Sequence, residues 1–94
     1  MKANKFIQMS KNMVKEYFNR YVAASDNIRK ITDEDIMTVR FQEDPDKYQI
    51  MLTVITDDDI YYMVTYDRST DEIYSYICGQ DGLRILGRKE NLNV

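Results

Sequence analysis

Two runs of alternating side chains, joined by three aspartates, occupy residues 48–66, with the sequence YQIMLTVITDDDIYYMVTY. In each run an apolar or aromatic residue returns at every second position, which is the period of a β-strand with one buried face. Aspartate is common in hairpin turns because its short side chain hydrogen-bonds to nearby backbone groups. The stretch therefore predicts two antiparallel strands, 48–56 and 60–66, with their turn at 57–59.

The same period extends the sheet on both sides of this hairpin. Residues 37–42 and 72–78 also alternate, and short segments rich in turn-forming residues connect them to the central pair. Consecutive strands joined by short turns pair as antiparallel neighbours. Residues 83–86 could add a short fifth strand at an edge, and we expect 87–94 to form a loose tail.

The register of the predicted strands can be tested by arithmetic, because opposed residues of an antiparallel pair have a constant sum of numbers and share a face. The register that best matches apolar and aromatic residues pairs Phe41 with Tyr48, Thr56 with Ile60, and Tyr66 with Ile73. One face of the sheet then consists of Met37, Val39, Phe41, Ile50, Leu52, Val54, Ile60, Tyr62, Val64, Ile73 and Ile77.

A helix precedes the sheet, because between residues 4 and 24 apolar side chains recur every three to four positions. This stripe consists of Phe6, Ile7, Met13, Val14, Tyr17, Phe18, Tyr21 and Val22. The opposite side of the helix carries the polar residues Lys5, Gln8, Asn12, Lys15, Glu16 and Asn19, which we expect to face solvent. One further helical turn is predicted within 31–36, with Thr32 as the N-cap and Ile31 and Ile36 as a hydrophobic staple.

Together these segments predict an α+β fold in a single domain that spans residues 1–94. One long N-terminal amphipathic helix, 4–24, packs on one face of a four- to five-stranded antiparallel meander sheet, 36–86. A chain of 94 residues and 11.2 kDa can build one core of this size.

The other face of the predicted sheet is the candidate site. Its first strand carries the polar residues Thr38, Arg40 and Gln42, as expected for a sheet face in water. The later strands place apolar and aromatic residues there, and the predicted partner-binding residues are Met51, Ile55, Tyr61, Met63, Tyr74 and Tyr76. In the same register Tyr61 opposes Cys78, Met63 opposes Tyr76 and Thr65 opposes Tyr74. A continuous patch of Met and Tyr is typical of protein interfaces; the alternative is that these tyrosines merely suit an exposed sheet surface.

The composition argues against an enzyme. The chain has no His, and so lacks the usual general base and the commonest metal ligand. The acidic clusters 33–35, 44–46 and 57–59 lack the order of ligands that a calcium loop requires. We therefore expect no catalytic residue, no cofactor, no metal site and no small-molecule substrate. No apolar run approaches the roughly 20 residues of a membrane span, and the single Cys78 suits the cytosol, so we expect a cytoplasmic protein that does not bind membranes.

The charge is unevenly distributed along the chain. Residues 1–30 hold seven basic and two acidic side chains, whereas 31–94 hold six basic and fourteen acidic ones, for a net charge of −3. An acidic surface could imitate nucleic acid and block a host protein that binds DNA or RNA, which is the alternative to docking through the sheet. Direct nucleic-acid binding would have to use the lysines of the helix, and a pI of about 4.8 is not typical of such proteins, so we do not expect it.

Two resemblances add context. The segments DKYQIML at 46–52 and YYMVTYDRSTDEI at 61–73, following a helix, resemble the helix-plus-meander of PepSY and cystatin-like modules, which often act as inhibitors or interaction domains. A more particular pattern, KFI at 5–7, VKEYFN at 14–19, ITDED at 31–35 and YYMVTYD at 61–67, is similar to a family of small uncharacterised proteins of phages and prophages of low-GC Gram-positive bacteria.

The second resemblance implies a context and no activity, because small acidic accessory proteins of phages often bind a host macromolecule. With the residue patterns, it leads to the prediction of a non-enzymatic cytoplasmic interaction module. We expect this module to bind a protein partner, or a second copy of itself, through the outer face of the sheet.

Overall fold

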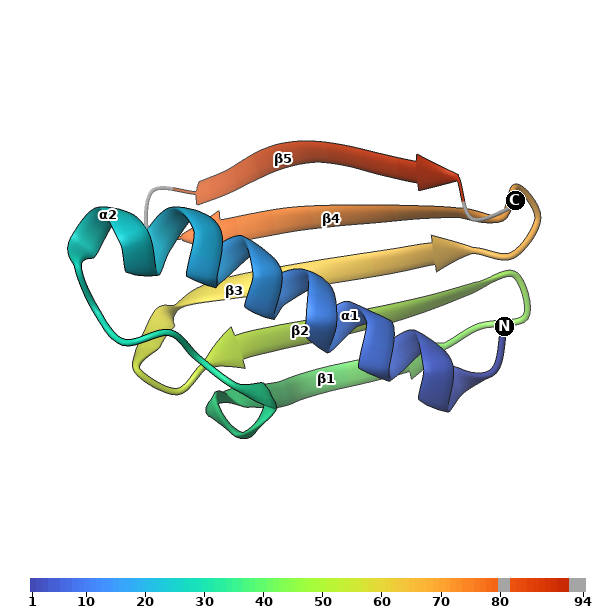
Figure 1. The fold of residues 1–94 in the computed structure, drawn as a ribbon. Helices are drawn as coiled ribbons and strands as arrows, with labels where there is room; N and C mark the ends of the chain where they lie inside the picture. Colours follow the sequence, from blue (N-terminus) through green and yellow to red (C-terminus); the bar gives the residue numbers. More distant parts are fainter. Residues whose placement is uncertain (80–81, 92–94) are drawn as a thin grey trace.

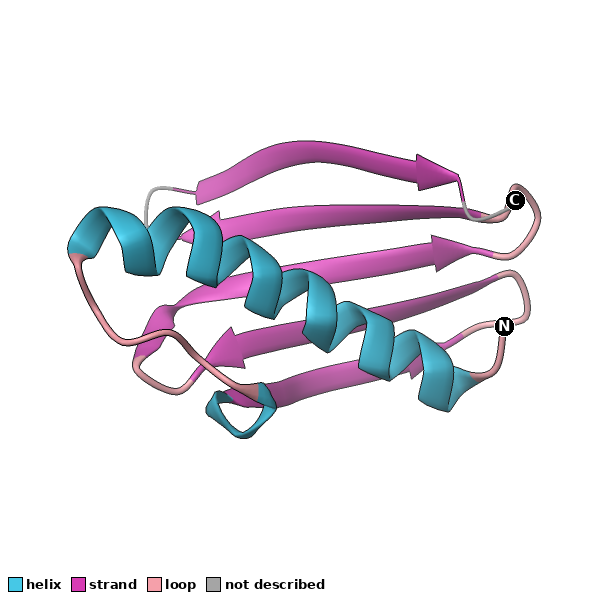
Figure 2. Cartoon of the chain, viewed as in Figure 1, coloured by secondary structure: helices cyan, strands magenta, loops and turns pink. Residues whose placement is uncertain are grey.

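A helical rod lies across one face of a five-stranded antiparallel sheet in the computed structural model, which describes residues 1–79 and 82–91 (Figures 1 and 2). The rod consists of α1 (Ala3–Tyr17), the π-helical segment η1 (Phe18–Ala23) and α2 (Ala24–Asp26). A 3-10 turn, η2 (Asp33–Asp35), precedes the sheet. The strands are β1 (Ile36–Glu43), β2 (Lys47–Val54), β3 (Asp57–Asp67), β4 (Glu72–Gly79) and β5 (Gly82–Asn91).

The strands are ordered β1-β2-β3-β4-β5, and each pairs antiparallel with the next. Because the connections are short, each strand pairs antiparallel with the strand that precedes it in the sequence, and the chain forms a meander. The predicted α+β architecture, with one amphipathic helix on an antiparallel meander sheet, is confirmed.

The predicted register between the first two strands is wrong. Phe41 pairs with Ile50 instead of Tyr48, and the register shifts between Thr38 and Arg40 at a β-bulge. A bulge adds one residue to one strand and so changes which side chains face inward. Met37 and Val39, both expected in the core, are 50% and 46% exposed, and Ile36 is buried instead.

The predicted register between β2 and β3 is off by two residues, since Val64 pairs with Ile50 and not with Leu52. A shift of two positions keeps every side chain on its predicted face, because the side-chain period of a strand is two. β3 begins at Asp57, so the turn consists of Ile55 and Thr56 and not of the aspartates 57–59. The predicted register between β3 and β4 is confirmed, with Tyr66 opposite Ile73.

The last strand is longer than predicted. β5 pairs with β4 over Gly82–Asn91, so residues 87–91, expected in a loose tail, belong to the sheet. The rest of the predicted tail, 92–94, lies outside the described residues.

The helical rod buries a stripe that changes period along its length. Phe6, Val14 and Phe18 are buried, as predicted, and Ala23 follows Phe18 at the five-residue spacing of a π-helix. The predicted stripe assumed the α-helical period throughout. Tyr21, which was placed in that stripe, is 54% exposed.

The core lies between this stripe and the inner sheet face, which we define as the face toward α1. Phe6 packs against the sheet aromatics, with ring centroids 5.4 Å from Tyr48, 6.3 Å from Phe41 and 6.4 Å from Tyr66. Among the described side chains of the sheet, the fully buried aliphatic ones are Ile50, Leu52, Val54, Val64 and Ile73. All five belong to the predicted inner face.

The linker from helix to sheet is held by specific contacts. Asn27, in the left-handed conformation with φ of 53°, ends the helical rod. The predicted helical turn is η2, in which the Thr32 N–H donates to the Asp35 carboxylate over 2.8 Å, and Ile31 and Ile36 are buried on either side. Lys15 and Gln8 of the helix donate to the Asp33 carboxylate over 2.8 and 2.9 Å, so part of the helix side predicted to face solvent binds this turn.

Candidate interaction surface

The candidate site is the outer sheet face, the side of the sheet away from α1. Its described residues come from four strands: Met37, Arg40 and Gln42 of β1; Gln49, Met51 and Thr53 of β2; Tyr61, Met63 and Thr65 of β3; and Tyr74, Tyr76 and Cys78 of β4. Figures 1 and 2 show the helical rod on the opposite face only. Within residues 1–79 and 82–91, no helix lies on the outer sheet face.

A central row of side chains crosses this face. Arg40 of β1 pairs with Met51, Met51 with Met63, and Met63 with Tyr76. The two methionines and the tyrosine are each half-buried, since neighbouring side chains cover part of them. The row therefore offers apolar and aromatic surface with one positive charge, at its β1 end.

A second row flanks the first. Gln42 pairs with Gln49, Gln49 with Thr65, and Thr65 with Tyr74. The Gln49 amide donates to the Met63 sulfur and to the Thr65 hydroxyl, each over 3.3 Å. These bonds tie the flanking row to the central one and restrict the Met63 side chain.

The predicted pairs of the outer sheet face are confirmed in register. Tyr61 lies opposite Cys78, Met63 opposite Tyr76, and Thr65 opposite Tyr74. Tyr61 is 38% exposed at one end of the face. Five of the six predicted partner-binding residues thus lie in strands that form this surface: Met51, Tyr61, Met63, Tyr74 and Tyr76.

The sixth predicted residue, Ile55, lies elsewhere. β2 ends at Val54, so Ile55 belongs to the β2–β3 turn and not to a strand. Its N–H donates to the Asp35 carbonyl over 2.8 Å, which ties the turn to η2, and its side chain is 55% exposed. Ile55 is therefore not part of the two rows.

Of the acidic clusters in the sequence, 33–35 holds a turn together, whereas the side chains of 57–59 are not described. Asp33 and Asp35 hold the turn η2 by hydrogen bonds. In the part of the chain that the structure describes, no three metal-ligating side chains come together. The side chains of 57–59 lie outside the description, so nucleic-acid mimicry by these residues stays a prediction.

Two titratable groups lie at the β3–β4 turn. The Tyr66 hydroxyl donates to the Asp71 carboxylate, and this bond, with burial, raises the pKa of Tyr66. The Asp67 carboxylate accepts hydrogen bonds from the hydroxyl and the N–H of Ser69, which lower its pKa. Both groups close the turn, and neither lies in the rows of the outer sheet face.

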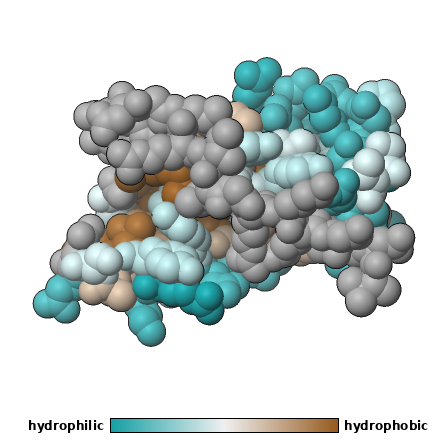
Figure 3. All heavy atoms as spheres, turned by 90° about the horizontal axis from the view of Figure 1, so that it is seen from above, coloured by the Kyte–Doolittle hydropathy of each residue, from teal (hydrophilic) through white to brown (hydrophobic). Residues whose placement is uncertain are grey.

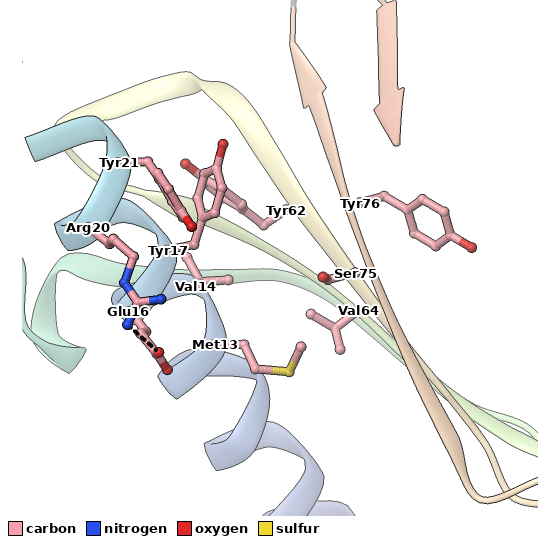
Figure 4. Close-up of a pocket in the computed structure, with 10 residues that line it drawn as sticks. All are labelled: Met13, Val14, Glu16, Tyr17, Arg20, Tyr21, Tyr62, Val64, Ser75 and Tyr76. Atoms are coloured by element: carbon pink, nitrogen blue, oxygen red, sulfur yellow. Dashed lines mark ion pairs between the residues drawn. The ribbon is translucent and has the colours of Figure 1, made fainter. Parts of the chain in front are cut away.

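Sequence reasoning missed a cleft on the helix side of the sheet. It has a volume of about 540 Å³ and opens between the helical rod and strands β3 and β4 (Figure 4). The helix supplies Met13, Val14, Glu16, Tyr17, Arg20 and Tyr21, and the sheet supplies Tyr62, Val64, Ser75 and Tyr76. In Figure 4 the Ser75 and Val64 side chains lie on the helix side of the sheet, whereas Tyr76 points away. No sequence signal marks this cleft, because it depends on the angle at which the helix crosses the strands.

Apolar surface is also visible when the molecule is seen from above. In that view brown, apolar residues appear on the left, the side of α2, while hydrophilic residues dominate the upper right (Figure 3).

Of the described helices, none is long and apolar enough to cross a membrane.

Comparison with known proteins gives a family. A family model described as a family of unknown function (DUF6275) matches residues 7–77, which include most of the helical rod, strands β1 to β3 and most of β4. The chain belongs to this family. No curated protein and no solved structure matches the chain. The membership agrees with the expectation of an uncharacterised domain and names no activity.

Proposed function

We propose that this chain is a non-enzymatic protein-interaction module whose contact surface is the outer sheet face, and that the protein seated there is a second copy of the chain. The observation that carries the proposal is the row Arg40, Met51, Met63 and Tyr76 on a face that the helical rod leaves uncovered. Contiguous apolar patches on a protein surface mark interaction sites when they extend over a few hundred Å². Met and Tyr are enriched in the centres of interfaces.

The order of the row favours a second copy. Packing two such faces about a two-fold axis parallel to the strands reverses the strand order, so Arg40 of one copy faces Tyr76 of the other, and Met51 faces Met63. A guanidinium over a tyrosine ring is attractive, and the same contact occurs within the fold, where Arg68 lies 4.0 Å above the Tyr48 ring. Arg40 forms no ion pair with another described residue.

The dimensions of the face are adequate. Five strands spaced about 4.8 Å apart, each with about eight residues at about 3.3 Å per residue, give a projected area of roughly 600 Å². A standard interface buries about 800 Å² on each partner. The face is thus of the size of a weak to standard contact, and sheet-on-sheet packing is an ordinary way to bury it.

The setting of this module belongs to the proposal as well. A cytoplasmic location agrees with the single Cys78, which has no second cysteine in the sequence to pair with. The proposed lack of catalysis agrees with the absence of His from the sequence. The phage or prophage context rests on the resemblance of about residues 5–76 to small proteins of that source. The likeness to PepSY and cystatin-like modules rests on the helix followed by a meander.

The experiment measures solution mass as a function of concentration. We expect light scattering and sedimentation of the unmodified chain to report a mass rising toward twice 11.2 kDa as concentration increases. The double variant Met63→Lys with Tyr76→Glu should stay a monomer with an unchanged circular dichroism spectrum, because both side chains lie on the surface and outside the core. The matched control Asn12→Lys, on an exposed helix position, should dimerise like the unmodified chain.

Two outcomes would overturn the proposal. An unmodified chain that remains a monomer at several hundred micromolar has no self-association to explain. A dimer that survives the double variant would have to use another surface. Arg40→Glu provides a further check, since loss of the cation should weaken association without abolishing it.

A further inference from the structure

We infer that the cleft between the helical rod and strands β3 and β4 is a binding site for a small, uncharged, planar aromatic molecule. This site lies on the helix side of the sheet, so it is separate from the outer sheet face and does not depend on the proposed self-association. Its volume of about 540 Å³ falls within the range of small-molecule sites, roughly 300 to 1,000 Å³.

Aromatic side chains form the walls of the cleft. The Tyr17 ring lies 5.1 Å from the Tyr21 ring in a tilted arrangement and 6.1 Å from the Tyr62 ring in an edge-to-face arrangement. Tyr62 is buried, so its ring supports Tyr17 from behind, and the Tyr17 and Tyr21 rings are the two that an occupant can contact. A flat aromatic molecule can meet the face or the edge of either ring with a favourable geometry. Tyr21 is half exposed at the mouth, so the site is open to solvent and can be entered without unfolding.

The remaining walls are apolar, with few polar groups. Met13 brings a flexible thioether that adapts to the shape of a ring, and Val64 closes the sheet side as a fully buried residue. The Ser75 hydroxyl lies on the helix side of the sheet and makes no hydrogen bond with another described residue (Figure 4). Apolar and aromatic walls with a few polar groups, here the Ser75 hydroxyl and the hydroxyls of the lining tyrosines, are typical of ligand sites.

The charges at the mouth argue for a neutral occupant. Arg20 and Glu16, one helical turn apart, form an ion pair of 3.4 Å and are both well exposed (Figure 4). Among the described residues that line the cleft, these two are the charged ones, and an ion pair of opposite charges gives neither a ligand carboxylate nor a ligand ammonium a net attraction. An uncharged ring meets no repulsive charge at this ion pair and still makes favourable contacts with the aromatic walls.

Indole is a suitable probe because the chain contains no Trp, so its emission can be excited at the long-wavelength edge, where the eight tyrosines absorb little, without a tryptophan signal from the protein. We expect saturable binding with a blue shift of the indole emission, and saturation-transfer signals in ligand-observed NMR. Ser75→Phe, which fills the cleft, should weaken binding at least tenfold, and Tyr21→Ala, which removes one wall, should weaken it several-fold. The matched control Thr70→Phe adds the same ring at an exposed position of the β3–β4 turn, outside the cleft and outside the rows of the outer sheet face, and should leave binding unchanged.

The charge argument has its own comparison. Indole-3-acetate and tryptamine, the anionic and cationic relatives of the probe, should bind no more tightly than indole. Tenfold tighter binding of either one would overturn the assignment of a neutral ligand.

Three results would overturn the site itself: no saturable binding of indole up to its solubility, equal binding by Ser75→Phe and the unmodified chain, or equal loss of binding by Thr70→Phe. If Ser75→Phe does not fold, judged by circular dichroism, Tyr21→Ala decides alone, because an exposed position tolerates truncation.

Discussion

The Asn19 side chain makes two hydrogen bonds with the backbone of one distant residue. Its amide nitrogen donates to the Ile31 carbonyl over 3.0 Å, and its amide oxygen accepts from the Ile31 N–H over 2.7 Å. Only an amide side chain can donate and accept in this way with a single planar group. Asn19 belongs to η1 and Ile31 precedes η2, so this pair of bonds fixes the linker against the helix and holds the Ile31 side chain in the core.

Asn19→Ala should therefore destabilise the fold by about 1 to 3 kcal/mol, because the part-buried backbone groups of Ile31 lose their partner. Urea unfolding followed by circular dichroism measures the change. The control is Asn12→Ala, on the same side of the helix, whose described side-chain bond is the exposed one from Gln8, and we expect a change within about 0.5 kcal/mol. Equal effects of the two substitutions would contradict this role of Asn19.

Among the secondary structure elements, the turn η2 connects the helix to the sheet through its carboxylates. The Asp33 carboxylate accepts hydrogen bonds from Lys15 and Gln8, which lower its pKa below the ordinary 3.8. The pKa of Asp35 is lowered as well, first by the Thr32 N–H and then by the Arg29 side chain. A carboxyl group whose pKa is lowered by folding adds stability that is present above the unfolded value and is lost as the pH falls.

We expect this contribution to disappear as the pH falls below about 4, with both carboxylates titrating below 3.8 in carboxyl-detected NMR. Lys15→Met should raise the pKa of Asp33 toward its ordinary value and leave that of Asp35 unchanged, since Lys15 bonds only to the first. Asp35 thus serves as the internal reference. A parallel rise of both pKa values would mean that η2 as a whole had come loose.

The elements also differ in how well the sequence predicts them. The β3–β4 register could be read from alternation, because both strands are regular over the paired length and Tyr66 and Ile73 mark the same face. The bulge in β1 and the π-helical segment could not be predicted in this way, because each inserts an extra residue into the regular repeat of a strand or helix. Val39 and Tyr21 are the residues at which the fixed period fails, and both are exposed.

At the scale of the whole molecule, a single helical rod lies diagonally on a sheet of five strands (Figure 1). The outer sheet face follows from alternation and from the count of helices, so most of it could be predicted from the sequence. The cleft lies where the rod and strands β3 and β4 meet, and this tertiary arrangement has no pattern that can be read along the sequence. The outer sheet face can thus be predicted from the period of the sequence, whereas the cleft depends on how the helix and the sheet pack together.

The response of self-association to salt tests which property of the whole molecule drives it. Each copy has a net charge of −3, and the two rows of the outer sheet face hold one charged residue, Arg40. Salt screens the repulsion between copies, while burial of Met and Tyr side chains is not screened. We expect the dimer dissociation constant, measured by sedimentation, to stay level or fall as sodium chloride rises from 20 to 500 mM, and to fall further in sodium sulfate, which strengthens apolar burial. A steep rise in the dissociation constant with salt would instead indicate contacts between opposite charges, and would favour the acidic, nucleic-acid-like surface as the part of the molecule that binds.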